Sequence, residues 1–297
     1  MSALLDALFR SSLATGLLSR CGFPRDRHLH CSVSGGADSL ALLFLARRTE
    51  MPLTVWHVDH GLRPDSSTEF RHVKAIADAL GVPAESRTVT VADGANVEAR
   101  AREARYSVLP HDVLTGHTAD DQAETVIINL LRGSGTAGLA GMRTDQRPLL
   151  GLRRDETHSL CRELGVRPLH DPMNDHDRYQ RVRIRKELMP LLVDLSRRDI
   201  VDVLTRQAGL LRDDDDLLEE LAAMIDVTDA RAIATAPVAL ARRAVRQWLA
   251  NPTPPDAATV ERVLGVARGD SRACDVGGGR EVRRSRQRLG LRFVEVM

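Results

Sequence analysis

The decisive stretch of this 297-residue chain reads Ser32-Val33-Ser34-Gly35-Gly36-Ala37-Asp38-Ser39. It follows a mostly apolar run over residues 29–33 and precedes a helical pattern of leucines, so it predicts a strand, a tight turn and a helix start. Glycines let the backbone approach an oxyanion closely, and a helix start directs N–H groups and the positive end of its dipole toward it. The stretch therefore predicts an anion-binding turn, although a strand–helix connector without function has a similar pattern.

Polar side chains in this turn favour phosphate as the anion. Ser34 and Ser39 supply hydroxyl donors, and the carboxylate of Asp38 can hold a hydrated Mg²⁺ that bridges phosphate oxygens. The turn is not a Walker loop, because the Gly-Lys-Ser/Thr ending and its wider spacing are missing. A phosphate-binding loop of another type is expected here.

Short apolar runs alternate with longer helical patterns through the first half of the chain. Strands are expected at residues 29–33, 53–58, 85–91, 112–115 and 148–152. Helices are expected at residues 3–18, 39–48, 66–80, 96–109, 119–131 and 155–164. This alternation predicts a doubly wound α/β fold with a mostly parallel five-stranded sheet, helices on both faces, and ligands at the carboxyl ends of the strands.

A cluster of acids follows the fourth expected strand. His117, Asp120, Asp121 and Glu124 open the helix expected at residues 119–131. An acid in a first turn can simply cap a helix and complement its dipole. Three carboxylates within five residues, next to a histidine, exceed what capping needs, so a metal site or an acid/base pair is the functional alternative.

Two further segments carry candidate ligand contacts. Asp59 and His60 follow the second expected strand, where they form either a capped turn or a nucleotide contact. Arg102 and Arg105 lie on the helix expected at residues 96–109. They either belong to a solvated face, with Glu98 pairing Arg102, or aim at phosphate and at charge that develops in a reaction.

The second part of the chain is helical and rich in arginine. Arginines near Tyr179, Arg181 and Arg185 among them, suit an RNA backbone, although a solvated basic face looks alike. A long helix pattern is expected at residues 198–224, interrupted by the acidic run at 213–216, which is a solvated helix face or a break rather than a cation site. Further helices are expected at residues 240–249 and 257–267, and strands at 281–284 and 289–294. We expect a catalytic domain over residues 1–197 and a small helical or α+β domain over residues 198–297.

The composition excludes several classes of protein. Lys and Arg number 42 against 41 Asp and Glu, so net charge does not argue for non-specific nucleic-acid binding. The four cysteines are scattered without CxxC spacing, which argues against a zinc knuckle or a cysteine-ligated iron–sulfur cluster and fits a reducing cytosol. No signal-peptide pattern and no apolar run of membrane-spanning length occurs, so a cytoplasmic protein is expected.

Taken together, six motifs resemble those of the tRNA(Ile)-lysidine synthetase family, whose fold is that of the N-type ATP pyrophosphatases (adenine nucleotide alpha hydrolase-like). The likeness covers about residues 25–195. The motifs are SGGxDS at 34–39, HVDHGLR at 57–63, ExxARxxRY at 98–106, HxxDDxxET at 117–125, LLRGSGxxGLxGM at 130–142 and DPxN…RxxIR at 171–185. Thr118 and Val182 depart from the family pattern, which often has His and Asn there, but no carboxylate or arginine is lost.

The resemblance implies a carbon–nitrogen ligase that uses ATP. In this family ATP adenylates the C2 carbonyl oxygen of the wobble cytidine in a tRNA(Ile) with a CAU anticodon, and the amine of L-lysine then displaces AMP. The implied partners are ATP, Mg²⁺, L-lysine and tRNA(Ile), without a membrane, and a homodimer is a family-level expectation. Two alternatives stay open: another enzyme with this pyrophosphate loop, such as a tRNA thiolase, or a tRNA-binding protein whose loop is vestigial.

The resemblance also implies roles for individual residues. Ser34, Gly35, Gly36, Ala37 and Ser39 would surround the pyrophosphate. Asp38, Asp121 and Glu124 would hold Mg²⁺, and Asp59 and His60 would lie near the adenosine. Arg102 and Arg105 would lie near the activated phosphate or the cytidine. Asp120 or His117 would deprotonate or place the lysine amine.

Overall fold

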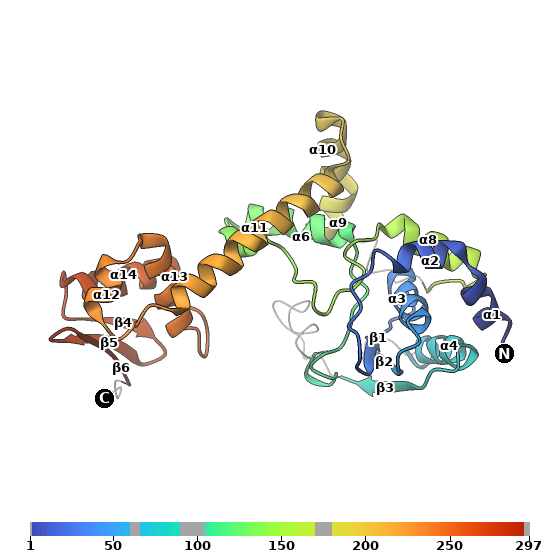
Figure 1. Cartoon of the computed structure of the whole chain (residues 1–297), viewed down its shortest axis with the longest axis horizontal. Coiled ribbons are helices and arrows are strands. Elements are labelled where there is room, and N and C mark those ends of the chain that lie inside the picture. Colours follow the sequence, from blue (N-terminus) through green and yellow to red (C-terminus); the bar gives the residue numbers. More distant parts are fainter. Residues whose placement is uncertain (1, 60–65, 90–103, 105, 170–179, 294–297) are drawn as a thin grey trace. The chain divides into compact units, whose positions relative to one another are not determined.

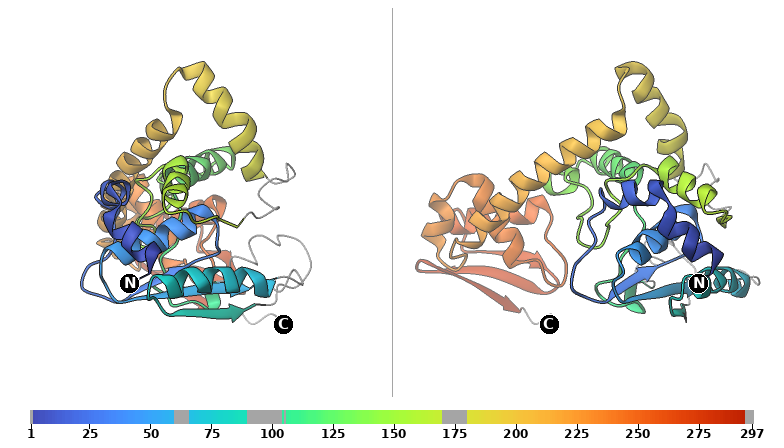
Figure 2. Two further views of the ribbon diagram at one scale, coloured as in Figure 1. Left: turned by 90° about the vertical axis from the view of Figure 1, so that its right-hand side faces the viewer. Right: turned by 45° about the vertical axis from the view of Figure 1, so that its right-hand side comes forward.

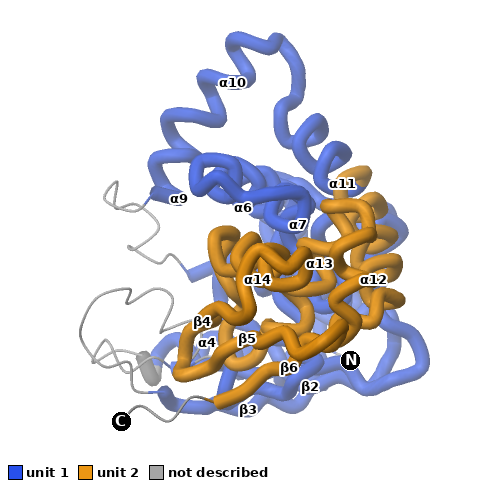
Figure 3. Tube along the Cα trace, turned by 90° about the vertical axis from the view of Figure 1, so that its left-hand side faces the viewer, with its two compact units in different colours: residues 1–209 blue, residues 210–297 orange. Residues whose placement is uncertain are grey.

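The structure, a computed structural model, describes residues 2–59, 66–89, 104, 106–169 and 180–293 (Figure 1). The chain divides into two units, Met1–Gly209 and Leu210–Met297, and the division falls inside the long helix α11 (Ile200–Ala223) (Figure 3). The domain boundary expected after residue 197 lies just before this helix and stays a prediction.

The first unit contains a parallel sheet with the strand order β1-β2-β3. The strands are β1 (Leu29–Ser32), β2 (Leu53–Asp59) and β3 (Ala84–Thr88). Cys31 of β1 pairs with Val55 of β2, and both side chains are fully buried. Because a shift by one residue would expose these side chains, burial of the apolar face fixes the register of the sheet. The first three strands predicted from the sequence are therefore confirmed within a few residues.

The chain reverses its direction across the sheet after β3. Cys31 pairs with Val55 of β2 and, through an isolated parallel bridge, also with Leu114. Leu114 therefore lies on the side of β1 away from β2, so β1 is flanked on both sides. In a doubly wound sheet such a reversal is the point where ligands bind, outside the carboxyl ends of the strands. The segments that follow β1 and Leu114 meet at this point.

The last two of the five predicted strands are wrong as regular strands. Leu114 contributes a single bridged residue, because Thr115 N already donates to Gln146 O (2.8 Å) instead of continuing along β1. The run at residues 148–152 forms turns: Pro148 has no N–H to donate, and Leu152 N donates to Leu149 O (2.9 Å). Its leucines are buried in these turns, so the apolar run indicates burial and not a strand.

One layer of helices contacts the strands, and a second layer packs on the first, as Figures 1 and 2 show. Helices α3 (Ala37–Arg48) and α4 (Ser66–Ala79) contact the strands directly. Helices α1 (Ala3–Arg10), α2 (Ser12–Leu18) and α8 (Arg154–Glu163) pack against α3. Because α3 is enclosed in this way, every residue from Leu40 to Ala46 is buried. The single helix predicted at 3–18 is broken at Ser11, whose hydroxyl caps α2 by accepting from Ala14 N (2.8 Å).

A second group of helices carries the acidic motif. It consists of α6 (Ala119–Leu131), α7 (Thr136–Leu139), α9 (Gln180–Arg183), a π-helical turn (Ile184–Leu188), α10 (Met189–Ser196) and the first half of α11. Ala123 and Ile127 of α6 pack with Ile184, Met189 and Leu204 into a separate apolar core. The bounds of α6 agree with the helix predicted at 119–131. The helix predicted at 96–109 lies largely outside the described residues.

The second unit packs three helices with an antiparallel sheet. Its elements are α12 (Ala230–Thr235), α13 (Val238–Trp248), α14 (Ala257–Arg268), β4 (Ala273–Gly277), β5 (Arg280–Ser285) and β6 (Arg288–Phe293). The expected strands at 281–284 and 289–294 correspond to β5 and β6, whereas β4 was not predicted. Helix α11 is not interrupted at its acidic run, because Asp215 is buried against Arg243 of α13 (2.7 Å). Among the described residues, no helix combines the length and the apolar character needed to cross a bilayer.

Candidate functional site

The glycine-rich turn after β1 is held in shape by one glycine and one hydroxyl. Gly35 has a φ of +91°, a conformation that side-chain-bearing residues rarely adopt, and a Cβ there would lie 2.6 Å from the Leu169 side chain. The Ser39 hydroxyl accepts hydrogen bonds from Ser34 N (3.2 Å) and Gly35 N (3.1 Å) and donates to Gly36 O (2.8 Å). Ser39 therefore stabilises the turn itself.

The start of α3 presents N–H groups at the carboxyl end of β1. Gly36 is the N-cap residue, and as a glycine it has no side chain that could accept hydrogen bonds from the first turn of the helix. The N–H groups of a first helical turn have no partner inside the helix, so those from Ala37 onward can donate to an anion. This is the arrangement that the sequence predicted for the turn.

Gly116 brings the acidic motif against this turn. A Cβ at Gly116 would lie 2.6 Å from Asp38 O and 3.0 Å from Ser39 N. Because real Cβ atoms do not approach backbone this closely, only glycine allows the chain after Leu114 to lie against the first turn of α3. The contact sets the distance between the glycine-rich turn and the first turn of α6.

Replacing Gly116 with alanine should therefore separate these two segments. We expect a loss of about 1–3 kcal/mol in the free energy of unfolding, the usual cost of overpacking, together with weaker nucleotide binding. The matched control is Gly16→Ala in α2, where a Cβ meets nothing within 4 Å and should be neutral or stabilising. Urea unfolding can be followed by Trp56 fluorescence in a Trp248→Phe background. Equal stability of Gly116→Ala and Gly16→Ala would contradict the close contact.

Asp121 is fixed at the start of α6 by a capping box. Its Oδ2 accepts hydrogen bonds from Thr118 N (2.9 Å) and from Thr118 Oγ1 (3.0 Å). Thr118 is the N-cap residue of α6 and is fully buried, so this departure from the family pattern has a structural role. Burial alone would raise the pKa of Asp121, but the charge of Arg154 and the Thr118 N–H outweigh it and lower the pKa below its ordinary value.

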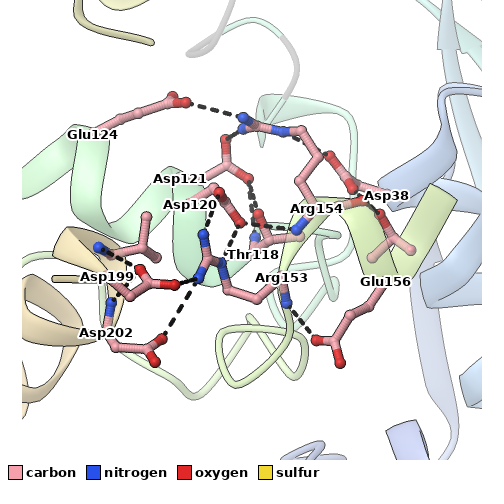
Figure 4. Close-up of polar contacts among 12 residues, drawn as sticks. Asp38, Thr118, Asp120, Asp121, Glu124, Arg153, Arg154, Glu156, Asp199 and Asp202 are labelled. Carbon is pink, nitrogen blue, oxygen red and sulfur yellow. Dashed lines mark hydrogen bonds and ion pairs between the residues drawn. The ribbon is translucent and has the colours of Figure 1, made fainter. Parts of the chain in front are cut away.

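Arg154, the first residue of α8, contacts three carboxylates from two different helices (Figure 4). Its Nη2 lies 2.9 Å from Asp121 Oδ1, its Nη1 lies 3.1 Å from Glu124 Oε1, and its Nε lies 3.7 Å from Asp38 Oδ2. One guanidinium thus joins the glycine-rich turn to the acidic motif. The sequence analysis did not single out Arg154, because an arginine beside Arg153 has no distinctive pattern in an arginine-rich chain.

Glu124 is the most buried carboxylate of the cluster, with 2% of its side chain exposed. Besides Arg154, it receives Arg181 Nε at 3.0 Å and Arg185 Nε at 2.7 Å. Arg181 and Arg185 lie one helical turn apart, on α9 and the following π-helical turn, so both reach the same carboxylate. Their guanidiniums bind Glu124, an arrangement that neither of the two readings, an RNA-facing surface or a solvated basic face, included.

Asp120 connects α6 to the start of α8. Its Oδ2 accepts hydrogen bonds from Arg154 N (2.8 Å) and from Arg153 Nε (3.3 Å). Arg153 also forms a close ion pair with Asp199, next to the first turn of α11, as Figure 4 shows. The carboxylate of Asp120 is thus already engaged by α8, and its role as a proton acceptor stays a prediction.

Asp38 lies in the first turn of α3 and faces the acidic motif. The hydroxyl of Thr157 donates a close hydrogen bond to Asp38 Oδ1. Burial raises the pKa of Asp38 above its ordinary value, although the hydrogen bond from Thr157 opposes this shift, and the negative charge of Asp121 adds to it. Asp38 and Asp121 are therefore close enough for their charges to interact.

These two carboxylates suit a hard divalent cation. Mg²⁺ is commonly held by one or two carboxylates together with water and substrate phosphates, and both Asp38 and Asp121 offer oxygens next to the predicted anion site. Glu124 suits it less, because three guanidiniums already surround its oxygens. Within the described residues, no group of three or more His, Cys, Asp or Glu side chains is arranged to hold a metal by itself.

The remaining predicted residues are placed as follows. His117 lies next to the start of α6, with its Nδ1 2.8 Å from Thr115 Oγ1. Asp59 is the last residue of β2, and its carbonyl oxygen accepts from Val89 N (2.8 Å). His60, Arg102 and Arg105 lie outside the described residues, so their contacts stay predictions.

A cleft of about 830 Å³ opens beside the acidic cluster, a size typical of sites for small molecules. One side of the cleft is formed by α6, the start of α8 and Arg185. The other side is formed by α10, the start of α11 and the residues between them. The lining residues are Asp120, Glu124, Arg153, Arg154, Arg185, Met189, Pro190, Val193, Asp194, Arg197, Arg198, Asp199, Ile200 and Val201.

Comparison with known proteins assigns both parts of the chain. Residues 10–192 match the PP-loop domain, and residues 229–290 match the TilS substrate binding domain. A tRNA(Ile)-lysidine synthase of Nocardia farcinica is 40% identical over 287 residues, which cover 88% of this chain and 90% of the relative. The chain belongs to the tRNA(Ile)-lysidine synthase family. A lysidine synthase of Rhodococcus erythropolis is 42% identical over 244 residues, covering 76% of this chain and 75% of that protein.

A solved structure outside the lysidine synthase family shares the fold. The U34-tRNA thiolase NcsA from Methanococcus maripaludis, solved with its [4Fe-4S] cluster, aligns with a TM-score of 0.55 at 16% identity over 69% of this chain and 80% of that one. At this identity the likeness concerns the fold alone. It agrees with the predicted adenine nucleotide alpha hydrolase-like architecture.

Several site residues of this lysidine synthase family member could not be found from local patterns. Arg153, Arg154 and Thr157 contact the predicted acids from positions far away in the sequence, and Asp199 pairs with Arg153. The run at residues 153–157 holds the charged and hydroxyl residues typical of any helix start. Only the register of α8 against α3 and α6 distinguishes these residues from a solvated cap.

Proposed function

We propose that this protein attaches L-lysine to C2 of the wobble cytidine in a tRNA(Ile) with a CAU anticodon, with ATP converted to AMP and pyrophosphate. The observation that carries the proposal is the succession of both family domains in one chain, with an anion-binding turn and an acidic cluster at the switch point of the first. A PP-loop domain implies the use of ATP, and the second domain implies a tRNA substrate.

The chemistry explains why such a site needs a nucleotide. The O2 of cytidine is a poor leaving group, so an amine cannot displace it directly. Once O2 is bonded to the α-phosphorus of AMP, it leaves as a phosphate. The N–H groups at Gly36 and Ala37 would bind the departing pyrophosphate, while Ser39 keeps the turn in shape.

Magnesium would be held by Asp38 and Asp121, whose carboxylates both contact Arg154. Bound there, it would neutralise charge on the triphosphate oxygens. Glu124 would act differently from the metal ligand that the sequence predicted: its buried charge holds Arg154, Arg181 and Arg185 in place.

Lysine would reach the adenylated cytidine through the cleft beside the acidic cluster. Its carboxylate could pair with arginines and its ammonium groups with Asp194 or Asp199, all of which line the cleft. His117 or Asp120 would place or deprotonate the attacking amine, and Arg102 and Arg105 would lie near the activated phosphate, as the family resemblance implies. We further expect a homodimer from the family resemblance.

A thiolase is not favoured by the cysteines. Cys31 and Cys161 are buried, and burial raises the pKa of Cys161 to about 12, so its thiol stays protonated at neutral pH. A persulfide carrier or a cluster ligand needs an accessible thiolate. A vestigial binding protein is not favoured either, because it would gain nothing from one buried and several half-buried carboxylates near a phosphate site.

The test is incorporation of ¹⁴C-lysine into an unmodified tRNA(Ile) CAU transcript. We expect incorporation only with ATP and Mg²⁺, one pyrophosphate released per lysine, and little labelling of an elongator tRNA(Met), which has the same anticodon. Incorporation of labelled sulfur instead of lysine would replace the proposal with a thiolase. Tight tRNA binding without pyrophosphate release would replace it with a binding module.

A further inference from the structure

We propose that Arg154 occupies the position between Asp38 and Asp121 that a divalent cation takes when ATP binds, so that the metal enters with the nucleotide and not before it. This inference rests on the magnesium site of the proposed function. It assigns Arg154 a positioning role: it holds the two carboxylates together until the metal replaces it.

The first argument is electrostatic. Asp38 and Asp121 come from different helices, and both of their negative charges contact the same cation. Arg154 is that cation, with contacts of 3.7 Å to Asp38 and 2.9 Å to Asp121. A guanidinium does not lose its proton in a protein, so it leaves this position only by moving.

The second argument is that Arg154 has a place to go. Its Nη1 already contacts Glu124 (3.1 Å), which is buried and does not suit a metal. Its backbone N–H is anchored on Asp120 Oδ2 (2.8 Å), so α8 stays in place while the side chain turns. The longest of its contacts is the one to Asp38, which also carries the neutral hydrogen bond from Thr157. Replacement of the guanidinium by the metal would therefore begin at Asp38.

The third argument concerns metal affinity. A divalent ion that approaches the two carboxylates without ATP meets the positive charge of Arg154, which repels the ion and lowers its affinity. The triphosphate supplies negative charge that attracts the metal and also gives the displaced guanidinium a new partner. The two carboxylates would thus bind the metal weakly in the absence of the nucleotide and tightly in its presence.

The experiment is a titration of the full-length protein with Mn²⁺, followed by electron paramagnetic resonance, without ATP, tRNA or lysine. We expect Arg154→Gln to bind Mn²⁺ at least about tenfold more tightly than the parent protein, and Arg154→Lys to lie between them. The gain should vanish in the double variant Arg154→Gln, Asp121→Asn. Arg183→Gln, which removes an exposed arginine paired with Glu187, is the matched control and should leave Mn²⁺ affinity unchanged.

A purely structural arginine would not raise metal affinity when it is removed. Equal or weaker Mn²⁺ binding by Arg154→Gln, with its fold verified by Trp56 fluorescence, would overturn the inference. If Arg154→Gln does not fold, Arg154→Lys decides in the same way, because its single ammonium cannot span both carboxylates. Parent-like Mn²⁺ binding together with normal lysine incorporation rejects this inference and leaves the proposed function intact. No Mn²⁺ binding even with a nonhydrolysable ATP analogue would reject both the inference and the magnesium site.

Discussion

Replacing Asp38 with alanine should lower the rate of pyrophosphate release by at least about 10³-fold, because it removes a charged group that acts on the reacting triphosphate. Asp38 lies in the first turn of α3, next to the amides that would bind the pyrophosphate, and it faces Asp121. The change removes a partner of Arg154 and of Thr157, and with it one of the two carboxylates of the proposed magnesium site. Binding of tRNA should change little, because the second family domain lies elsewhere in the chain.

The measurement is pyrophosphate release with saturating tRNA(Ile), together with tRNA affinity from filter binding. Asp78→Ala is the control, because Asp78 lies on the exposed surface of α4, where it forms an i,i+4 pair with Lys74. It should retain parental activity. The role of Asp38 would be wrong if Asp38→Ala released pyrophosphate at the parental rate, or if it lost tRNA binding to the same degree as activity.

Replacing Glu124 with glutamine should destabilise the first unit by about 2–4 kcal/mol, since it leaves a cluster of guanidiniums without their buried counter-charge. The side chain keeps its shape, so the loss would come from charge and not from a cavity. Three arginines would then repel one another around a neutral amide at the place where α6, α8 and α9 meet. Lysine incorporation should fall as well, because Arg154 and Arg185 also border the cleft.

Urea unfolding followed through Trp56, in the Trp248→Phe background, reports on the first unit alone. The matched control is Glu187→Gln, which breaks an exposed pair with Arg183 and should change the free energy of unfolding by less than about 0.5 kcal/mol. A loss for Glu124→Gln no larger than that of Glu187→Gln would show that the arginines do not depend on this carboxylate.

The parts of the fold that were predicted well depend on neighbours in the sequence. The helix expected at 119–131 agrees with α6, because Thr118 and Asp121 form a cap within one turn and the apolar residues repeat at helical spacing. The tight turn at Gly35 could also be predicted from the sequence, since it requires a backbone conformation that few residues other than glycine tolerate. The run at 148–152 was misread because apolar residues bury equally well in a turn and in a strand.

The acidic residues of the candidate site were predicted from the sequence, but the arginines that neutralise them were not. Asp121 lies 33 positions away from Arg154, and Asp38 lies 119 positions away from Thr157, so no local pattern connects them. Arg181 and Arg185 were expected to face RNA or solvent, whereas they neutralise Glu124. The acidic run in α11 was expected to interrupt the helix, because its partner Arg243 lies on a different helix.

The amino-acid sequence by itself determined the strand–turn–helix order, the position of the acids at the carboxyl edge and the family, since periodicity, turn chemistry and motif spacing are properties of short segments. Tertiary structure alone decided which charge neutralises which. An ion pair forms only when folding brings distant side chains within a few ångströms in a partly dehydrated place. That is why Arg154, which no motif marks, lies at the centre of the acidic cluster.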